Sequence, residues 1–353
     1  MKKICMVEYQ GRVDEKGEPV GHGPKVFSEY YGLLKDQFDI CAFGTREILN
    51  VLTSKYNVRS KVLEGKIVMK GKNSFFEKIA NKIHMFKNIG AAMKNADADT
   101  IWFFNSEYYL MLYLALHKKS TKRVVVTMFL DGYHGGFVNK VKQFIFEQAQ
   151  KKIDMIIASG ANFTFKNCDS IYIPDYYYEP AVYDYYKAQK KSDRCVCLGT
   201  MGAGKELDDL VEAFSKNGYP LHIVGRFYDK DWYEALKSKA SDNITIEDRY
   251  LSEEDYMTLL STSRYTVLPY NPAKYNTQTS GVMQEAVFTD TIVVAFEQVL
   301  NGNDTSGVSF LSWQQCGQLD LHKDYRDVLC RYERQRNTIY NIKEIRNKYE
   351  EVL

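Results

Sequence analysis

Residues 194–216 read RCVCLGTMGAGKELDDLVEAFSK. An apolar run that fits a buried strand, 194–198, leads into a glycine-rich loop and then into a pattern of helical period at 205–216. Strand, tight loop and helix are the repeating parts of doubly wound α/β sheets, whose ligands bind beyond the carboxyl ends of the strands. The stretch therefore predicts a fold class and the place of a site.

The same alternation recurs in two series along the chain. Continuous apolar runs separated by helical patterns are typical of parallel sheets covered on both faces. The first series has expected strands at 3–8, 38–42, 100–104, 123–128, 155–158 and 170–173, and the second at 194–198, 221–224, 243–246, 265–268 and 291–295. The sequence thus predicts an α/β protein with two doubly wound, Rossmann-like domains.

The two series meet at IPDYYYEP, residues 173–180, where two prolines interrupt the alternation and indicate a linker. We therefore expect an N-terminal domain at 1–174 and a C-terminal domain at 175–324. A final helical stretch, 325–353, is expected to join the N-terminal domain. The length of 353 residues suits two domains of ordinary size.

Composition narrows the class of protein. Hydrophobic residues make up 45% and charged residues 26%, as in soluble globular enzymes. The seven cysteines are scattered, and no Cys/His cluster has zinc spacing, so we expect reduced thiols and no metal site. Cys195 and Cys197 are expected to fill the core. No apolar run is long enough for a signal peptide or a membrane span, and we expect a cytoplasmic protein.

The glycine-rich loop matches the phosphate loop of nucleoside triphosphatases except at its last residue. From Gly199 it reads Gly, four residues, Gly and Lys205, but the Ser or Thr that binds Mg²⁺ is replaced by Glu206. A carboxylate at that place would repel the phosphates. We therefore favour a loop in which Lys205 binds phosphate without a metal ion. The alternative is a glycine-rich turn with a solvated lysine.

Two further loops of the second series follow expected strands. Ser280 precedes an expected helix, and the amides of Ser280, Gly281 and Val282 would form an anion site at its start. Glu285 lies one turn further on the same face, where it could accept hydrogen bonds from a ribose. Arg226 could reach a diphosphate with two donors. The alternatives are an ordinary capped helix and a surface ion pair.

The first series offers two candidate loops. GHGP at 21–24 precedes a helix, and Gly21 and Gly23 would let a phosphate or a sugar approach the backbone, although Gly-Pro is also ordinary turn chemistry. FLDGYHGG at 129–136 follows a strand. There Asp131 and His134 could contact a sugar, or they are ordinary loop residues.

Taken in order, these segments resemble the nucleotide-binding domain of GT-B glycosyltransferases, most closely glycosyltransferase family 4. The resemblance is carried by LGTMGAGKELDDLVEAF, LHIVGRFYD, NITIEDRYLSEEDYMTLLSTSRYTVLPY and TSGVMQEAVFTDTIVVA. It covers 150–296 well and the first 150 residues weakly. It implies two domains facing a cleft, Lys205 as the phosphate lysine, and Tyr250 in the nucleobase region.

The sequence departs from that family at three places. The paired glutamates of the family fall at 277 and 285, and Thr277 replaces the first of them. The arginine that accompanies the phosphate lysine falls near Thr200, so Arg226 would supply the second positive charge. The histidine of the N-terminal domain falls near Phe129, and His134 is the nearest one.

The resemblance implies transfer of a sugar, with retention of configuration, from a nucleotide-diphosphate donor to a glycan or lipid-linked glycan in surface polysaccharide synthesis. No metal or other cofactor is expected. The catalytic candidates are Lys205, Arg226, Glu285, Asp131 and His134. The alternatives are a sugar-nucleotide epimerase of the same fold and a non-catalytic protein that binds sugar nucleotides.

Basic charge gathers at 58–95, with nine Lys and Arg against two Glu. Within it, the stretch 74–94 places Phe75, Ile79, Ile83 and Phe86 on one face of a helix with lysines nearby. A basic amphipathic helix can lie on an anionic membrane, here the inner face of the cell membrane; alternatively, its apolar stripe packs on the sheet. Aromatic and basic residues do not recur together on a strand, so no nucleic acid partner is expected.

Overall fold

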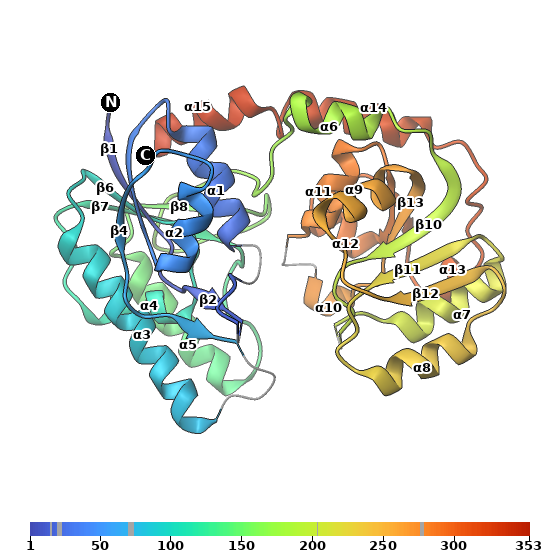
Figure 1. The fold of residues 1–353 in the computed structure, drawn as a ribbon, viewed down its shortest axis with the longest axis horizontal. Helices are drawn as coiled ribbons and strands as arrows, with labels where there is room; N and C mark the ends of the chain where they lie inside the picture. Colours follow the sequence, from blue (N-terminus) through green and yellow to red (C-terminus); the bar gives the residue numbers. More distant parts are fainter. Residues whose placement is uncertain (15, 20–22, 70–73, 203, 276–278) are drawn as a thin grey trace. The chain divides into compact units, whose positions relative to one another are not determined.

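The computed structural model describes residues 1–14, 16–19, 23–69, 74–202, 204–275 and 279–353 (Figure 1). Gly21 and Thr277 lie outside the described residues. The chain divides into two compact units, which we call unit 1 (Met1–Asp175 with Ile345–Leu353) and unit 2 (Tyr176–Glu344). Each unit is an α/β layer structure around a parallel sheet, which confirms the predicted fold class.

The unit 1 sheet has seven parallel strands in the order β4-β3-β1-β6-β7-β8-β9. Their bounds are β1 (Lys3–Val7), β3 (Asp39–Gly44), β4 (Arg59–Val62), β6 (Thr100–Phe103), β7 (Arg123–Met128), β8 (Met155–Ala158) and β9 (Ser170–Tyr172). A separate pair joins β2 (Arg12–Val13) to β5 (Ile67–Val68). Each strand expected from the sequence is found, with its ends displaced by at most two residues.

Helices cover both faces of this sheet. They are α1 (Gly23–Leu34), α2 (Arg46–Thr53), α3 (Phe75–Asn95), α4 (Tyr108–Leu116), α5 (Gly136–Gln150) and α15 (Ile342–Val352). Helices α3, α4 and α5 share one core with Ile101 and Val124 of the sheet. On the opposite face, Trp102 contacts the rings of Tyr30 on α1 and Tyr349 on α15. Helix α15, at the C-terminus of the chain, therefore belongs to the core of unit 1.

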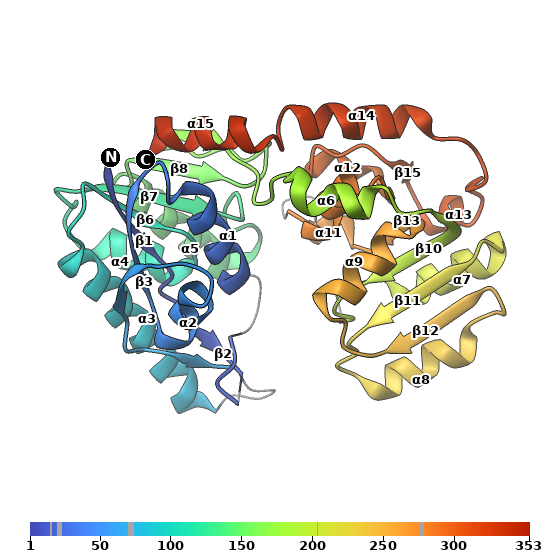
Figure 2. The same cartoon turned by 45° about the horizontal axis from the view of Figure 1, so that its top comes forward.

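The unit 2 sheet has six parallel strands in the order β12-β11-β10-β13-β14-β15 (Figure 2). The strands are β10 (Ser192–Leu198), β11 (Leu221–Gly225), β12 (Ile244–Asp248), β13 (Ser263–Leu268), β14 (Ile292–Phe296) and β15 (Val308–Phe310). The helices are α6 (Pro180–Lys187), α7 (Leu207–Asn217), α8 (Lys230–Lys239), α9 (Glu253–Ser261), α10 (Pro272–Tyr275), α11 (Gly281–Phe288), α12 (Glu297–Gly302), α13 (Trp313–Cys316) and α14 (Arg326–Asn337).

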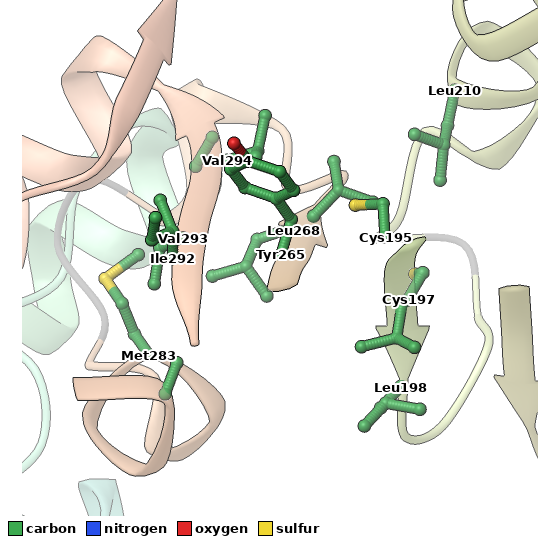
Figure 3. Close-up of a cluster of buried hydrophobic side chains, with 14 of the residues drawn as sticks. Cys195, Cys197, Leu198, Leu210, Tyr265, Leu268, Met283, Ile292, Val293 and Val294 are labelled. Carbon is green, nitrogen blue, oxygen red and sulfur yellow. The ribbon is translucent and has the colours of Figure 1, made fainter. Parts of the chain in front are cut away.

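Figure 3 shows Cys195 and Cys197 of β10 among the buried side chains of unit 2, with Leu210 of α7 and Met283 of α11. Burial raises the pKa of both thiols. The two cysteines are core residues, as the sequence predicts.

One expectation about how the C-terminal stretch is divided between the domains is wrong. The stretch 325–353 does not join the first unit as a whole, because α14 packs on α11 in unit 2, where Arg336 forms an ion pair with Asp290. The predicted linker, 173–180, contains the boundary between the two units, which falls after Asp175, and Tyr176 and Tyr178 beyond that boundary lie in the core of unit 2. Periodicity identifies a helix but does not identify the surface on which it packs.

None of the helices in the described part of the chain has both the length and the apolar composition needed to cross a membrane.

Two glycines let the loops after β10 and β11 approach each other. Gly199 has a φ of +99°, which side chains rarely allow, and a Cβ added at Gly225 would lie 1.7 Å from the Gly199 carbonyl oxygen. This contact is between backbones, so no side-chain movement can relieve it.

We therefore expect Gly225→Ala to lower the free energy of unfolding by at least about 2 kcal/mol, because the loops must separate. Gly202→Ala is the matched control, since its Cβ would meet nothing nearer than Tyr228 at 3.9 Å. Urea denaturation of both variants measures the difference. Equal stability of the two variants would contradict the close approach.

Candidate functional site

The candidate site lies at the carboxyl ends of β10, β11 and β13 in unit 2. Strand β10 pairs with β11 on one side and with β13 on the other. The connection after β10 leads to β11, and the connection after β13 leads to β14, so the two loops diverge. Such a switch in strand order is where ligands of open α/β sheets bind.

Lys205 ends the loop that follows β10. Its Nζ donates a hydrogen bond to the Leu198 carbonyl oxygen at 2.9 Å and lies 5.9 Å from the ring centre of Tyr270. Burial lowers the pKa of Lys205. In the part of the chain that the structure describes, no carboxylate forms an ion pair with this ammonium group. Lys205 is therefore a partly enclosed cation without a counter-charge.

Glu206 does not neutralise its neighbour. Its carboxylate accepts hydrogen bonds from Asn271 Nδ2 at 2.7 Å and from Trp313 Nε1 at 2.8 Å. The expected helix begins two residues late, at Leu207, which leaves Glu206 at its N-cap. Glu206, the residue that differs from a triphosphate loop, is thus hydrogen-bonded to Asn271 and Trp313. Its carboxylate does not pair with Lys205.

The start of α11 differs from the prediction at one amide. Ser280 occupies the N-cap without a capping hydrogen bond, and its amide donates to Asn303 Oδ1 at 3.1 Å. The prediction of three open amides is therefore wrong for Ser280. The amides of Gly281 and Val282 find no acceptor among the described residues. Two donors remain at the positive end of this helix.

Tyr270 links the lysine to this helix start. Its ring lies beneath the Lys205 ammonium group, and its hydroxyl oxygen is 3.3 Å from Ser280 Oγ. Its backbone forms an isolated β-bridge with Lys205. The lysine and the amides of Gly281 and Val282 are therefore parts of one cluster within unit 2.

Glu285 is buried one turn into α11 and accepts a hydrogen bond from the Tyr256 hydroxyl at 2.7 Å. Burial, followed by the nearby carboxylate of Glu285, raises the pKa of Tyr256. At Gly281 a Cβ would lie 2.8 Å from the Tyr176 hydroxyl, so tyrosine side chains surround this turn. The carboxylate is therefore buried and hydrogen-bonded within unit 2.

Arg226 is exposed, and its guanidinium has no ion-pair partner within the described ranges. Its carbonyl oxygen accepts from the Met201 amide at 2.9 Å, which ties its loop to the loop of Lys205. Tyr250, after β12, is 80% exposed, and the amide of the preceding Arg249 donates to the Gly225 carbonyl oxygen. Backbone hydrogen bonds therefore connect the loops after β10, β11 and β12.

The candidates of the first series lie in unit 1. Asp131 Oδ1 and His134 Nε2 are 2.8 Å apart and form a hydrogen-bonded pair in the loop after β7. Gly23 is the first residue of α1, and a Cβ there would touch no described atom. The structure thus brings Asp131 and His134 together.

Sequence reasoning missed Tyr270, Tyr256, Asn303 and Trp313. Tyr270 is the second residue after β13, so the rule that sites follow strand ends would have found it. Asn303 and Trp313 act through contacts with residues 23 and 107 positions away. No local pattern marks such contacts.

The hydrogen bond from the Tyr256 hydroxyl is expected to stabilise the buried carboxylate of Glu285. We expect Tyr256→Phe to lower the free energy of unfolding by about 2 kcal/mol, because a buried carboxylate loses a donor. Tyr233→Phe on α8 is the control, since the structure gives that hydroxyl no hydrogen-bond partner among the described residues. Chemical denaturation measures both, and equal losses would refute the role given to this hydrogen bond.

Comparisons with protein-family models and with curated proteins give no match. Solved structures do match. Anabaena HepE in complex with UDP and glucose is 12% identical, with a TM-score of 0.63 over 100% of this chain and 99% of that chain. TarM is 11% identical, with a TM-score of 0.66 over 100% and 98%. The α,α-trehalose-phosphate synthase (UDP-forming) from Burkholderia vietnamiensis is 10% identical, with a TM-score of 0.65 over 100% and 99%. These likenesses show the fold, which is that of GT-B glycosyltransferases with two Rossmann-like units.

Proposed function

We propose that the chain is a glycosyltransferase that uses a nucleotide-diphosphate sugar as its donor. The observation that carries the proposal is the Lys205 ammonium group, partly enclosed and without a carboxylate partner in the described part of unit 2. Across Tyr270, the open amides of Gly281 and Val282 provide further donors. A cation and helix-start amides at strand ends suit a diphosphate.

The similar structures support the choice of donor. One was solved with UDP and glucose, and another is named as a UDP-forming synthase. We propose that Lys205, Arg226 and the two α11 amides bind the diphosphate, while Glu285 accepts hydrogen bonds from the ribose and Tyr250 lies near the base. Gly199 lets the chain turn toward the phosphates at its φ of +99°.

In the proposed reaction, the bond between the anomeric carbon and the β-phosphate oxygen breaks. Lys205, Arg226 and the amides stabilise the negative charge that develops on this oxygen. The departing phosphate accepts the proton of the acceptor hydroxyl, whose oxygen bonds to the anomeric carbon on the same face, so configuration is retained. The positive charge comes from side chains, and the proposal requires no metal ion.

The acceptor that we propose is a glycan or a lipid-linked glycan of surface polysaccharide synthesis. Asp131 and His134 are proposed to contact the acceptor as a hydrogen-bonded pair, and Gly23 lets a sugar approach the start of α1. We place the protein in the cytoplasm, peripherally on the membrane that would carry such an acceptor, with 74–94 as the contacting segment.

A thermal-shift panel of UDP, GDP, dTDP and CMP, followed by their sugars, tests the proposal, since a ligand of the folded state raises the Tm. The donor is then incubated with and without acceptor glycans. Sugar transfer supports the proposal. Isomerisation of the sugar in donor alone would indicate an epimerase, and binding without turnover would indicate a non-catalytic protein.

We expect Lys205→Ala and Glu285→Gln each to lower kcat/KM by roughly ten- to a hundredfold, since each removes a charge-assisted contact worth about 1.5–3 kcal/mol. Lys216→Ala is the control, because this lysine lies exposed on α7, where it pairs with Glu212. Steady-state kinetics with the identified donor measures all three. Near-normal turnover in both site variants would rule out the assignment.

A further inference from the structure

The N-terminal half of α3 carries an apolar stripe that faces solvent. The core contacts of this helix come from its C-terminal half, through Met85, Ile89 and Ala92. Phe75 is 71% exposed and Phe76 is 80% exposed, and Ile79 and Ile83 are exposed on the next turns. The alternative that this stripe packs on the sheet is therefore wrong for the first half of the helix.

Helix α5 repeats this arrangement of a buried C-terminal half and an exposed N-terminal half. Its buried residues include Phe146 and Ala149 near its C-terminus. Phe137 is 81% exposed and Phe144 is 62% exposed, with Val138 and Val141 exposed between them. The spacing 137, 141 and 144 places three of these side chains on one face of the helix. An apolar stripe in solvent marks an interaction surface.

The two stripes lie on the same side of unit 1. Helices α3, α4 and α5 cover one face of its sheet, and α4 packs against both of the others. Figures 1 and 2 both show α3 and α5 on this side. Helix α3 leads into β6 and helix α5 leads into β8, and these strands run parallel in one sheet, so the N-terminal halves of both helices lie toward the carboxyl ends of the strands.

Positive charge accompanies the apolar side chains. Helices α3 and α5 contain six lysines and two glutamates. Both glutamates have partners, since Glu77 belongs to the capping box of Ser74 and Glu147 pairs with Lys166 at 2.8 Å. An open groove of about 410 Å³ continues the stripe of α3 between Ile83 and Tyr113, and Lys82 and Lys87 are among its lining residues. Among the described residues, none of these six lysines forms an ion pair with a carboxylate, although Lys82 and Lys142 lie over tyrosine rings.

We infer that the exposed apolar residues of 75–83 and 137–144, which we call the α3–α5 face, together dock on an anionic lipid bilayer. Exposed Phe and Val side chains would enter the boundary between headgroups and acyl chains, and the lysines would meet the lipid phosphates. A second copy of this chain fits less well, because a two-fold contact would bring lysines against lysines. This inference rests on the proposed function, because a lipid-linked acceptor would be the reason for the protein to bind a membrane.

The test is co-sedimentation of the full chain with phosphatidylcholine vesicles, with and without about one third phosphatidylserine. We expect binding to the anionic vesicles that weakens as salt rises. Phe76→Ser and Phe137→Ser should each weaken the partition by about tenfold, since each removes one exposed aromatic ring from the apolar layer. Tyr185→Ser is the control, because Tyr185 is an aromatic residue on α6 in unit 2 that is also largely exposed.

Phe137→Ser decides the new part of the inference. Wild-type binding by this variant would overturn the two-helix face, as would failure of the wild-type chain to bind anionic vesicles at low salt. If the wild-type chain dimerises in sedimentation velocity and Phe137→Ser abolishes the dimer, the face binds a second copy of the chain. That result would overturn the proposal that it docks on a lipid bilayer. The Tm shift with nucleotides, measured on the same variants, should stay unchanged, so loss of vesicle binding and failure of the donor proposal are distinguished.

Discussion

The ammonium group of Lys205 is the feature on which the candidate site depends. It is held at the end of β10 by the Leu198 carbonyl oxygen and the ring of Tyr270. Partial burial disfavours the charged form and lowers the pKa of Lys205, and no carboxylate in the described part of the chain forms an ion pair with it. A carboxylate lies one residue away in Glu206, but Asn271 and Trp313 hold it elsewhere. The protein thereby leaves a positive charge that an anionic ligand would satisfy.

The surrounding backbone keeps this charge in place. The contact between Gly199 and Gly225, the hydrogen bond from the Met201 amide to the Arg226 carbonyl oxygen, and the bridge from Lys205 to Tyr270 connect three strand ends. Each of these contacts lies within unit 2. The donor site that we propose is therefore built on the rigid strands of one sheet, which favours a fixed geometry for the phosphates.

Most of the strands and helices, and part of the candidate site, could be predicted from the sequence. Apolar runs and helical periods located the strands and showed that Cys195 and Cys197 are core residues, because buried parallel strands leave a strong local signal. Lys205 was found because it follows a strand and a glycine-rich loop. What the sequence missed depends on distant contacts: Asn303 takes the Ser280 amide, and α14 packs on α11. The apolar stripe of α3 was visible, but its exposure was not, because periodicity does not tell which side of a helix meets the sheet.

A crystal structure of the chain with UDP tests the central claim most directly. The account predicts that oxygens of the diphosphate lie within about 3.2 Å of Lys205 Nζ and of the amides of Gly281 or Val282. It also predicts that the carboxylate of Glu206 stays on Asn271 and Trp313. A diphosphate bound elsewhere, with Lys205 Nζ still on the Leu198 carbonyl oxygen, would contradict the account.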